Sequence, residues 1–165
     1  MRLILIRHAA AFERDRKRWR DDRHRPLTPE GMKRFRKAAA GLASLVETVE
    51  CVLTSPLARA RQTAQILSAV TRWPHAREVA ELAPGHTPDQ VLARVRTEKA
   101  EVLALVGHEP GLSELIAASL AGAGARLQCE LKKGGAACLE FPSTARAGQA
   151  RLAWLVTPKA LRALA

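Results

Sequence analysis

Two histidines in this 165-residue chain stand at the ends of apolar runs, where a reactive side chain can be held in a fixed position. His8 ends the run at residues 3–8, which reads Leu-Ile-Leu-Ile-Arg-His and places Arg7 beside it. His108 follows a second apolar run at residues 102–106 and one glycine. An imidazole can act as a nucleophile or as a base, and the guanidinium of Arg7 carries a permanent positive charge. This combination suits chemistry on an anionic group.

A third segment adds cations at the start of an expected helix. Residues 55–63 read SPLARARQT and place Arg59 and Arg61 in the first two turns. Cations at a helix N-terminus oppose the helix dipole by about 0.3–1 kcal/mol each at exposed positions. A bound oxyanion reverses that sign, because it uses both the dipole and the guanidinium. Taken alone, the segment is equally compatible with arginines that extend into solvent; together with Arg7 and the two histidines it favours an anion site.

The two apolar runs have the continuous hydrophobicity of strands in a parallel sheet. Ligand sites of open α/β sheets lie beyond the carboxyl ends of their strands, so both histidines are expected at the same edge. Strands alternate with helical patterns, which predicts one domain over residues 1–165, a three-layer α/β/α sandwich with a mostly parallel central sheet. We expect strands at residues 3–8, 51–54, 102–106, 136–141 and 151–156, the last two as a hairpin, and a brief strand or extended turn at 78–82.

Helices are expected between these strands, and two of them begin with a hydroxyl residue followed by proline. Thr28 and Ser55 are these residues, so we expect both side chains to cap a helix. In the first helix an apolar stripe recurs every three or four residues from Met32 to Val46, and would cover one face of the sheet. The remaining helices are expected to begin near residues 89, 110 and 158.

Residues 13–25 form a strongly charged segment that reads ERDRKRWRDDRHR. It has no apolar periodicity, which predicts a loop or a frayed surface helix. The segment could guide an extended anionic substrate or remain solvated, and we expect most of it to be solvated. Arg25 is the residue of this segment most expected to reach an anion site. Trp19 could anchor a partner, although packing over the loop is the commoner outcome for such an aromatic.

The composition is typical of a globular protein that meets something anionic. Hydrophobic residues make up 47% of the chain, and the formal net charge is +11. No apolar stretch approaches the roughly 20 residues needed to cross a bilayer, and the first run is too short for a signal peptide, so we expect a cytoplasmic protein with no membrane partner. Cys51, Cys129 and Cys138 lack the spacing of a zinc site or a disulfide framework, which predicts reduced, inert thiols.

Four motifs of the chain, in their order along the sequence, resemble those of the histidine phosphatase superfamily, whose fold is phosphoglycerate mutase-like. They extend over the chain from residue 2 to about residue 120, and the wording Arg-Pro-Leu-Thr-Pro-Glu-Gly is most similar to small bacterial phosphohistidine phosphatases of the SixA type. Each motif alone is weak, whereas four in register are specific. They are RHA at residues 7–9, LTPEG at 27–31, SPLARARQT at 55–63 and VGH at 106–108.

The resemblance implies a phosphatase in which His8 attacks phosphorus and forms a covalent phosphohistidine that water then hydrolyses. Arg7, Arg59 and His108 would surround the phosphoryl oxygens, with Arg25 as a further phosphate-binding candidate. No metal or cofactor is implied. The expected substrate is a phosphorylated protein, foremost one carrying phosphohistidine, or a small phosphorylated metabolite. The alternative is a non-catalytic polyanion-binding module; nucleic acid is disfavoured, because aromatic residues are only 4% and no nucleic-acid motif is present.

The proton donor is the least determined role. In larger family members a glutamate after the second helix protonates the leaving oxygen, and Glu81 stands in the corresponding stretch, although an ordinary surface carboxylate is equally compatible. Glu109 is a lesser candidate, and a phosphoramidate leaving group can be protonated without either. The chain departs from the family in having Ala9 where glycine is common, which would exclude glycine-only backbone angles. It also lacks a mutase-type insertion, which argues against phosphoglycerate mutase activity. The sequence predicts no particular oligomeric state.

Overall fold

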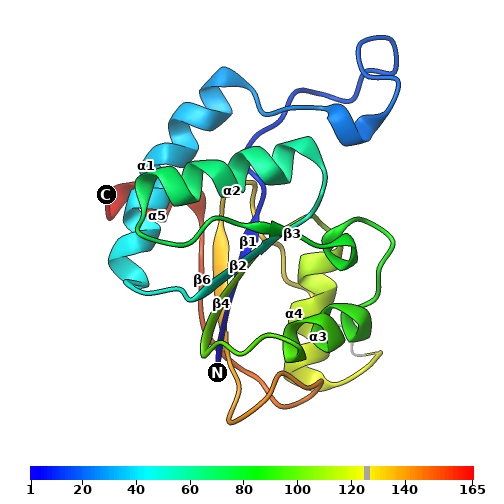
Figure 1. Ribbon diagram of the computed structural model, residues 1–165, viewed down its shortest axis with the longest axis vertical. Coiled ribbons are helices and arrows are strands. Elements are labelled where there is room, and N and C mark those ends of the chain that lie inside the picture. The colour runs from blue at the N-terminus through cyan, green and yellow to red at the C-terminus, as the bar shows by residue number, and fades with distance from the viewer. Residues whose placement is uncertain (125–126) are drawn as a thin grey trace.

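The computed structural model describes residues 1–124 and 127–165, which fold into three layers around a six-stranded sheet (Figure 1). The strand order is β3-β2-β4-β1-β5-β6. The first four strands of this order run parallel, whereas β5 is antiparallel to both of its neighbours. The predicted sandwich with a mostly parallel sheet is therefore confirmed. The strands are β1 (Arg2–Arg7), β2 (Cys51–Thr54), β3 (Arg77–Glu78), β4 (Val102–Gly107), β5 (Ala136–Glu140) and β6 (Arg151–Val156).

Helices cover both faces of the sheet. Figure 1 places α1, α2 and α5 on one face and α3 and α4 on the other. The central strand β1 serves both layers, because Ile4 and Ile6 belong to the core under α1 and α2, while Leu3 and Leu5 belong to the core under α3 and α4. The helices are α1 (Pro29–Leu45), α2 (Ala58–Val70), α3 (Pro88–Arg96), α4 (Gly111–Ala121) and α5 (Pro158–Ala163), with 3-10 turns η1 (Asp22–His24) and η2 (Ala80–Leu82).

The register of the sheet brings the two histidines together. Strands β1 and β4 are parallel neighbours, with Arg7 opposite Gly107. His8 directly follows β1 and His108 directly follows β4. The two histidines therefore lie side by side at the carboxyl edge of the sheet, the edge at which both were predicted. Strand β2 lies on the other side of β4 and delivers Ser55 to the same edge.

One of the two predicted helix caps is correct and the other is wrong. Thr28 caps α1, because its hydroxyl oxygen accepts a hydrogen bond from the Gly31 amide at 2.9 Å. Gly31 also packs so closely against the chain that a Cβ there would lie 2.1 Å from the Ala10 carbonyl oxygen. Ser55 does not cap α2, which begins at residue 58 with no side-chain cap. The local serine–proline pattern is overridden by a tertiary contact of the Ser55 hydroxyl, described below.

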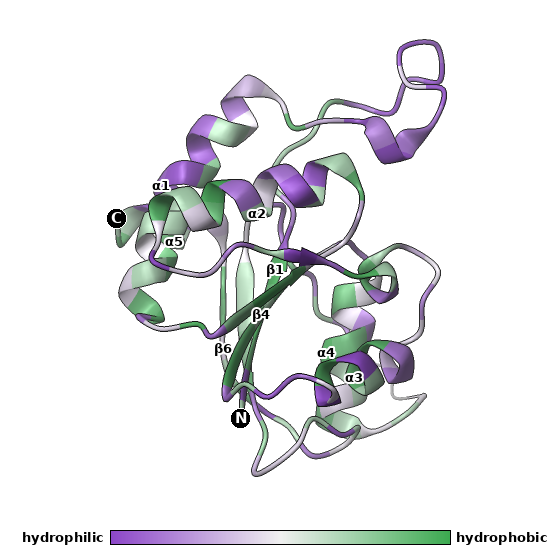
Figure 2. Ribbon diagram, viewed as in Figure 1, coloured by the Kyte–Doolittle hydropathy of each residue, from purple (hydrophilic) through white to green (hydrophobic). Residues whose placement is uncertain are grey.

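Residues 13–25 form an irregular excursion that contains η1 and no α-helix. It extends away from the body of the molecule near the carboxyl edge of the sheet, and it is almost uniformly hydrophilic (Figures 1 and 2). Trp19 is half-buried and packs on Phe12, with ring centroids 5.4 Å apart, so the aromatic residue packs within the loop. In the described part of the chain, no helix combines the length and apolarity required to span a bilayer.

The three cysteines are free thiols. Burial raises the pKa of all three, that of Cys138 to about 11. At neutral pH they are therefore protonated and weak nucleophiles, in agreement with the expectation of inert thiols.

Candidate active site

His8 is a buried imidazole with one free nitrogen. Its side chain is 7% exposed, and Nδ1 lies 2.7 Å from the Ala9 carbonyl oxygen. A carbonyl can only accept, so Nδ1 carries the proton and Nε2 keeps its lone pair. Burial, together with the charges of Arg59 and Arg7, lowers the pKa of His8 to about 3 against the opposing effect of the Ala9 hydrogen bond. His8 is thus neutral at physiological pH, the state required of a nitrogen nucleophile.

Ala9 fits the position where related sequences commonly have glycine. None of the described non-glycine residues has a positive φ, so the backbone at Ala9 does not need glycine. The Ala9 amide donates to Thr63 Oγ1 at 3.0 Å, and the Thr63 hydroxyl donates to the Arg59 carbonyl oxygen at 2.7 Å. These bonds join the end of β1 to the helix that carries Arg59.

His108 faces His8, with ring centroids 5.0 Å apart. Its Nε2 lies 2.8 Å from the Ser55 hydroxyl oxygen, which already accepts from the Leu57 amide. The Ser55 hydroxyl can donate its proton to His108 Nε2, and in this arrangement the His108 proton lies on Nδ1. Burial lowers the pKa of His108 to about 2, and the nearby His8 and Arg59 add to this effect. His108 is therefore a neutral hydrogen-bond donor.

Arg59 is almost completely buried and is held by one residue of the charged loop. Its Nη1 donates to the Asp22 carbonyl oxygen at 3.0 Å, and its Nη2 lies 3.2 Å from Asp22 Oδ2. Arg25 donates from Nε to Asp22 Oδ1 at 2.7 Å, and the resulting hydrogen bond, together with Arg59, holds the pKa of the Asp22 carboxyl below its usual value. Arg25 thus contacts the residue that holds Arg59, and its role in binding phosphate stays a prediction. In contrast, Arg61 is 44% exposed and pairs with Glu78 at 3.5 Å, outside the site.

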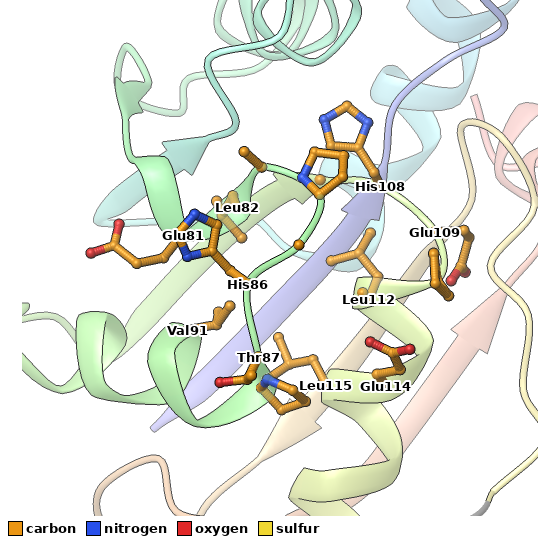
Figure 3. A pocket seen from close by; sticks show the side chains of 17 residues that line it. Glu81, Leu82, His86, Thr87, Val91, His108, Glu109, Leu112, Glu114 and Leu115 are labelled. Carbon is orange, nitrogen blue, oxygen red and sulfur yellow. The ribbon is translucent and has the colours of Figure 1, made fainter.

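Arg7 is fixed by the segment that precedes β5. Its Nη1 donates to the Leu131 carbonyl oxygen at 2.6 Å and lies 3.6 Å from Glu130 Oε1. The Leu131 amide in turn donates to Glu109 Oε1 at 2.9 Å, and Glu109 also accepts from the amide and hydroxyl of Ser113. Glu109 points away from the neighbouring cavity (Figure 3). Its carboxylate is therefore committed to holding the backbone around Arg7.

A cavity of about 350 Å³ lies beside His108, between the segments at residues 81–88 and 107–115. Its walls are largely apolar, and Glu81 and His86 stand on one side of it (Figure 3). The Glu81 carboxylate points away from the His108 ring in this view. The structure therefore brings Glu81 to the rim of the cavity and does not bring it into contact with the histidines.

Three buried hydrogen-bond donors at this edge lack partners. Arg7 Nε, Arg59 Nε and His108 Nδ1 have no acceptor among the described residues, and Ser119 Oγ, elsewhere in the fold, is the one other such side-chain atom there. An unsatisfied buried polar group costs about 1–3 kcal/mol, so three of them on neighbouring residues require an explanation. An oxyanion bound among them would accept these hydrogen bonds. A neutral imidazole beside a cluster of unpartnered donors, at the carboxyl edge of the sheet of an α/β sandwich, indicates the class of protein: an enzyme that acts on an anionic group.

The comparison with known families agrees with this class. The model of the histidine phosphatase superfamily (branch 1) matches residues 3–127, and the chain belongs to this family. It is therefore a hydrolase that acts on phosphate esters.

Similar proteins cover most of the chain. An uncharacterised protein of Picosynechococcus sp. is 41% identical over 117 residues, which are 69% of this chain and 70% of that protein. A structure of the protein histidine phosphatase SixA with tungstate has a TM-score of 0.81 at 24% identity and covers 98% of this chain and 99% of that one. A putative phosphohistidine phosphatase SixA from Nakamurella multipartitia has a TM-score of 0.74 at 28% identity, with 95% of each chain covered.

Several residues of the site were not singled out from the sequence. Asp22 stands in a loop of alternating charges, where no local pattern distinguishes it from its neighbours. Ser55 has the local signature of a helix cap, and Thr63 has that of an ordinary helical residue. Glu130 and His86 come close to the site only through the folding of distant segments. Ser55 and Thr63 belong to the motif at residues 55–63, but the motif did not predict their contacts with His108 and Ala9.

Proposed function

We propose that this protein removes phosphoryl groups through a covalent phosphohistidine at Nε2 of His8, without a metal ion. The observation that carries the proposal is the state of His8: Nδ1–H is bound to the Ala9 carbonyl, and Nε2 has no hydrogen-bond partner among the described residues. The nitrogen opposite a donating Nδ1 is the one with a free electron pair. Nε2 is thus the attacking atom.

In the first step the electron pair of Nε2 forms a bond to phosphorus, and the bond from phosphorus to the leaving oxygen or nitrogen breaks. The electron pair of that bond stays on the leaving atom, which takes a proton from solvent or, for a phosphoramidate, already carries it. The unpartnered donors of Arg7, Arg59 and His108 are suited to bind the phosphoryl oxygens throughout. Such fixed donors supply most of the catalysis in phosphoryl transfer.

In the second step the oxygen of a water molecule attacks phosphorus, the phosphorus–Nε2 bond breaks, and the electron pair returns to His8. Inorganic phosphate leaves, and the proton of the water goes to solvent. Glu81 and Glu109 are not needed in this scheme, since neither carboxylate is oriented toward the histidines. Among the two, Glu81 remains the candidate that movement of the cavity rim could bring closer.

The favoured substrate is a protein that carries phosphohistidine. The likeness to SixA-type structures over nearly the whole chain supports this choice. The short connection beside the cavity supports it as well, because only residues 83–87 lie between η2 and α3, with no inserted subdomain there to enclose a small metabolite. Hydrolysis of a small phosphorylated metabolite is the alternative.

The direct test is hydrolysis of p-nitrophenyl phosphate in the presence of a chelator, compared between the native protein and His8→Ala. We expect turnover by the native protein and none by the variant. The matched control is His75→Ala, which makes the same substitution at an exposed histidine that is far from β1 in the sequence. Turnover that persists in His8→Ala would refute the proposed nucleophile, and a complete lack of turnover with every phosphoryl donor would favour a binding module.

A further inference from the structure

The charged segment at residues 13–25, here called the basic arm, has features that the phosphoryl-transfer chemistry does not explain. We propose that the basic arm docks onto an acidic surface of the protein whose phosphoryl group the site removes. This inference rests on the proposed function, and it adds the kind of protein that carries the phosphoryl group.

The arm presents positive charge that the fold itself does not use. It contains seven Arg or Lys residues and four Asp or Glu residues. Arg16, Lys17 and Arg20 are exposed and have no ion-pair partner among the described residues. Even an exposed ion pair contributes only about 0–1 kcal/mol to stability, so stability does not account for these unpaired cations.

The arm is ordered by contacts of its own. The guanidinium of Arg18 lies 4.5 Å from the ring centroids of both Phe12 and Trp19. The Asp15 carboxylate accepts from the amides of Lys17 and Arg18 at 2.8 and 3.2 Å. Cations held on such a scaffold lose less conformational entropy on binding than cations on a free chain. The arm is thus suited to form an interface.

The base of the arm forms one wall of the active site. Asp22, near the end of the arm, binds Arg59 through both its carbonyl and its carboxylate, and Arg25 donates to the Phe12 carbonyl oxygen at 2.6 Å. His8 is 7% exposed, so only a small part of its side chain is open to an incoming group. A protein whose phosphorylated side chain reaches His8 must bring its own surface to the rim, where the arm projects (Figure 1).

The mixture of charges favours a protein partner over a nucleic acid. Glu13, Asp15 and Asp21 alternate with the cations, and each of them would repel a uniform polyanion such as a phosphodiester backbone. A protein surface that is acidic overall can place its own basic groups opposite these carboxylates. Complementary charge of this kind steers association and makes it sensitive to salt.

The test compares two phosphohistidine peptides of equal length, flanked either by glutamates or by glutamines. The arm variant is Arg16→Glu, Lys17→Glu and Arg20→Glu. Its matched control is Arg72→Glu, Lys99→Glu and Lys159→Glu, which makes the same change of charge at exposed residues outside the arm. Binding is measured by fluorescence anisotropy on a His8→Ala background, and cleavage is measured with His8 present.

We expect the native arm to bind the glutamate peptide at least about tenfold more tightly than the glutamine peptide at low salt, and the control to keep this preference. The arm variant should lose the preference, while its turnover of p-nitrophenyl phosphate stays within about twofold of native. Equal binding of the two peptides by the native arm, or a preference that survives in the arm variant, would overturn the proposal.

Two further outcomes separate the hypotheses. If the native protein turns over no phosphoryl donor, the proposed function fails, but the anisotropy measurement still decides the role of the arm. If duplex DNA binds the native arm more tightly than the glutamate peptide at the same salt concentration, and the arm variant loses this binding, the partner is a nucleic acid and the assignment to an acidic protein is wrong.

Discussion

Burial lowers the pKa of both His8 and Arg59, but it leaves His8 neutral and Arg59 positively charged. Burial lowers the pKa of His8 to about 3, so the imidazole is neutral. Burial also lowers the pKa of Arg59, but the guanidinium starts from so high a value that it stays protonated, and Asp22 opposes the shift. One environment thereby supplies a neutral nucleophile and a permanent cation side by side.

The protonation state of His8 can be observed by NMR. With imidazole ¹⁵N labelling, in a buffer free of phosphate and sulfate, the His8 resonances should report a single Nδ1–H tautomer and no titration between pH 8 and about 4.5, because burial lowers the pKa to about 3. His8→Ala assigns the signal. A midpoint near the ordinary histidine value would contradict the description of this site.

Arg59 and Arg61 form a matched pair for mutagenesis, two residues apart on the same helix. Arg59→Lys should lower kcat/KM for p-nitrophenyl phosphate by about a hundredfold, because an ammonium cannot reproduce the forked geometry that engages Asp22 and an oxyanion together. Arg61→Lys should change it by less than about twofold, since Arg61 is a solvent-exposed ion-pair partner of Glu78. If the two substitutions change kcat/KM equally, Arg59 has no special role in the active site.

At the scale of elements, the site depends on how α4 is tied to the chain that precedes β5. Glu109, next to the start of α4, accepts from the Leu131 amide, and the Leu131 carbonyl accepts from Arg7. Glu109 also binds Ser113 in the first turn of the helix. This series of hydrogen bonds makes Glu109 a positioning residue for Arg7.

Glu109→Ala should therefore weaken phosphoryl binding without removing an acid from the reaction. We expect KM to rise and kcat to fall several-fold, the shape of the pH profile to stay unchanged, and the free energy of unfolding to decrease by about 1–3 kcal/mol. Glu114→Ala is the control, because Glu114 lies in the first turns of α4 close to Glu109 and is exposed. Loss of one limb of the pH profile in Glu109→Ala would instead identify Glu109 as the proton donor.

The sequence was sufficient to predict the elements and the residues at their ends, because local patterns determine both. Continuous apolar runs identified β1 and β4 and predicted His8 and His108 at the same edge of the sheet, whereas the contact between them depends on the two strands being neighbours, which the sequence did not indicate. The partners of these residues could not be predicted, because they depend on tertiary contacts. Ser55 follows the pattern of a helix cap and instead binds His108, and Asp22 has the same local surroundings as the other acids of its loop.

At the scale of the whole molecule, the site lowers stability in acid. His8 and His108 are neutral in the folded protein down to about pH 3 and about pH 2, whereas in the unfolded chain both are protonated below about 6.5. Between these values the unfolded state binds more protons than the folded state. The free energy of unfolding must therefore fall as the pH is lowered through this window.

This linkage predicts that unfolding by urea becomes easier between pH 6.5 and about 4.5, before most carboxylates are protonated. The double variant His8→Gln, His108→Gln should have a lower free energy of unfolding at pH 7 and a shallower dependence on pH across the same window. A dependence as steep as that of the native protein would mean that the two histidines are not buried in neutral form.

The central claim is that phosphate passes through a covalent bond to His8. The most direct measurement is mass spectrometry of the protein quenched in base during turnover of a phosphoryl donor, since phosphohistidine survives base and is lost in acid. We expect one added phosphoryl group on the peptide that contains His8, attached at Nε2, and its absence in His8→Ala. A phosphoryl group on any other residue, or turnover with no phosphorylated protein under conditions that trap the intermediate, would contradict it.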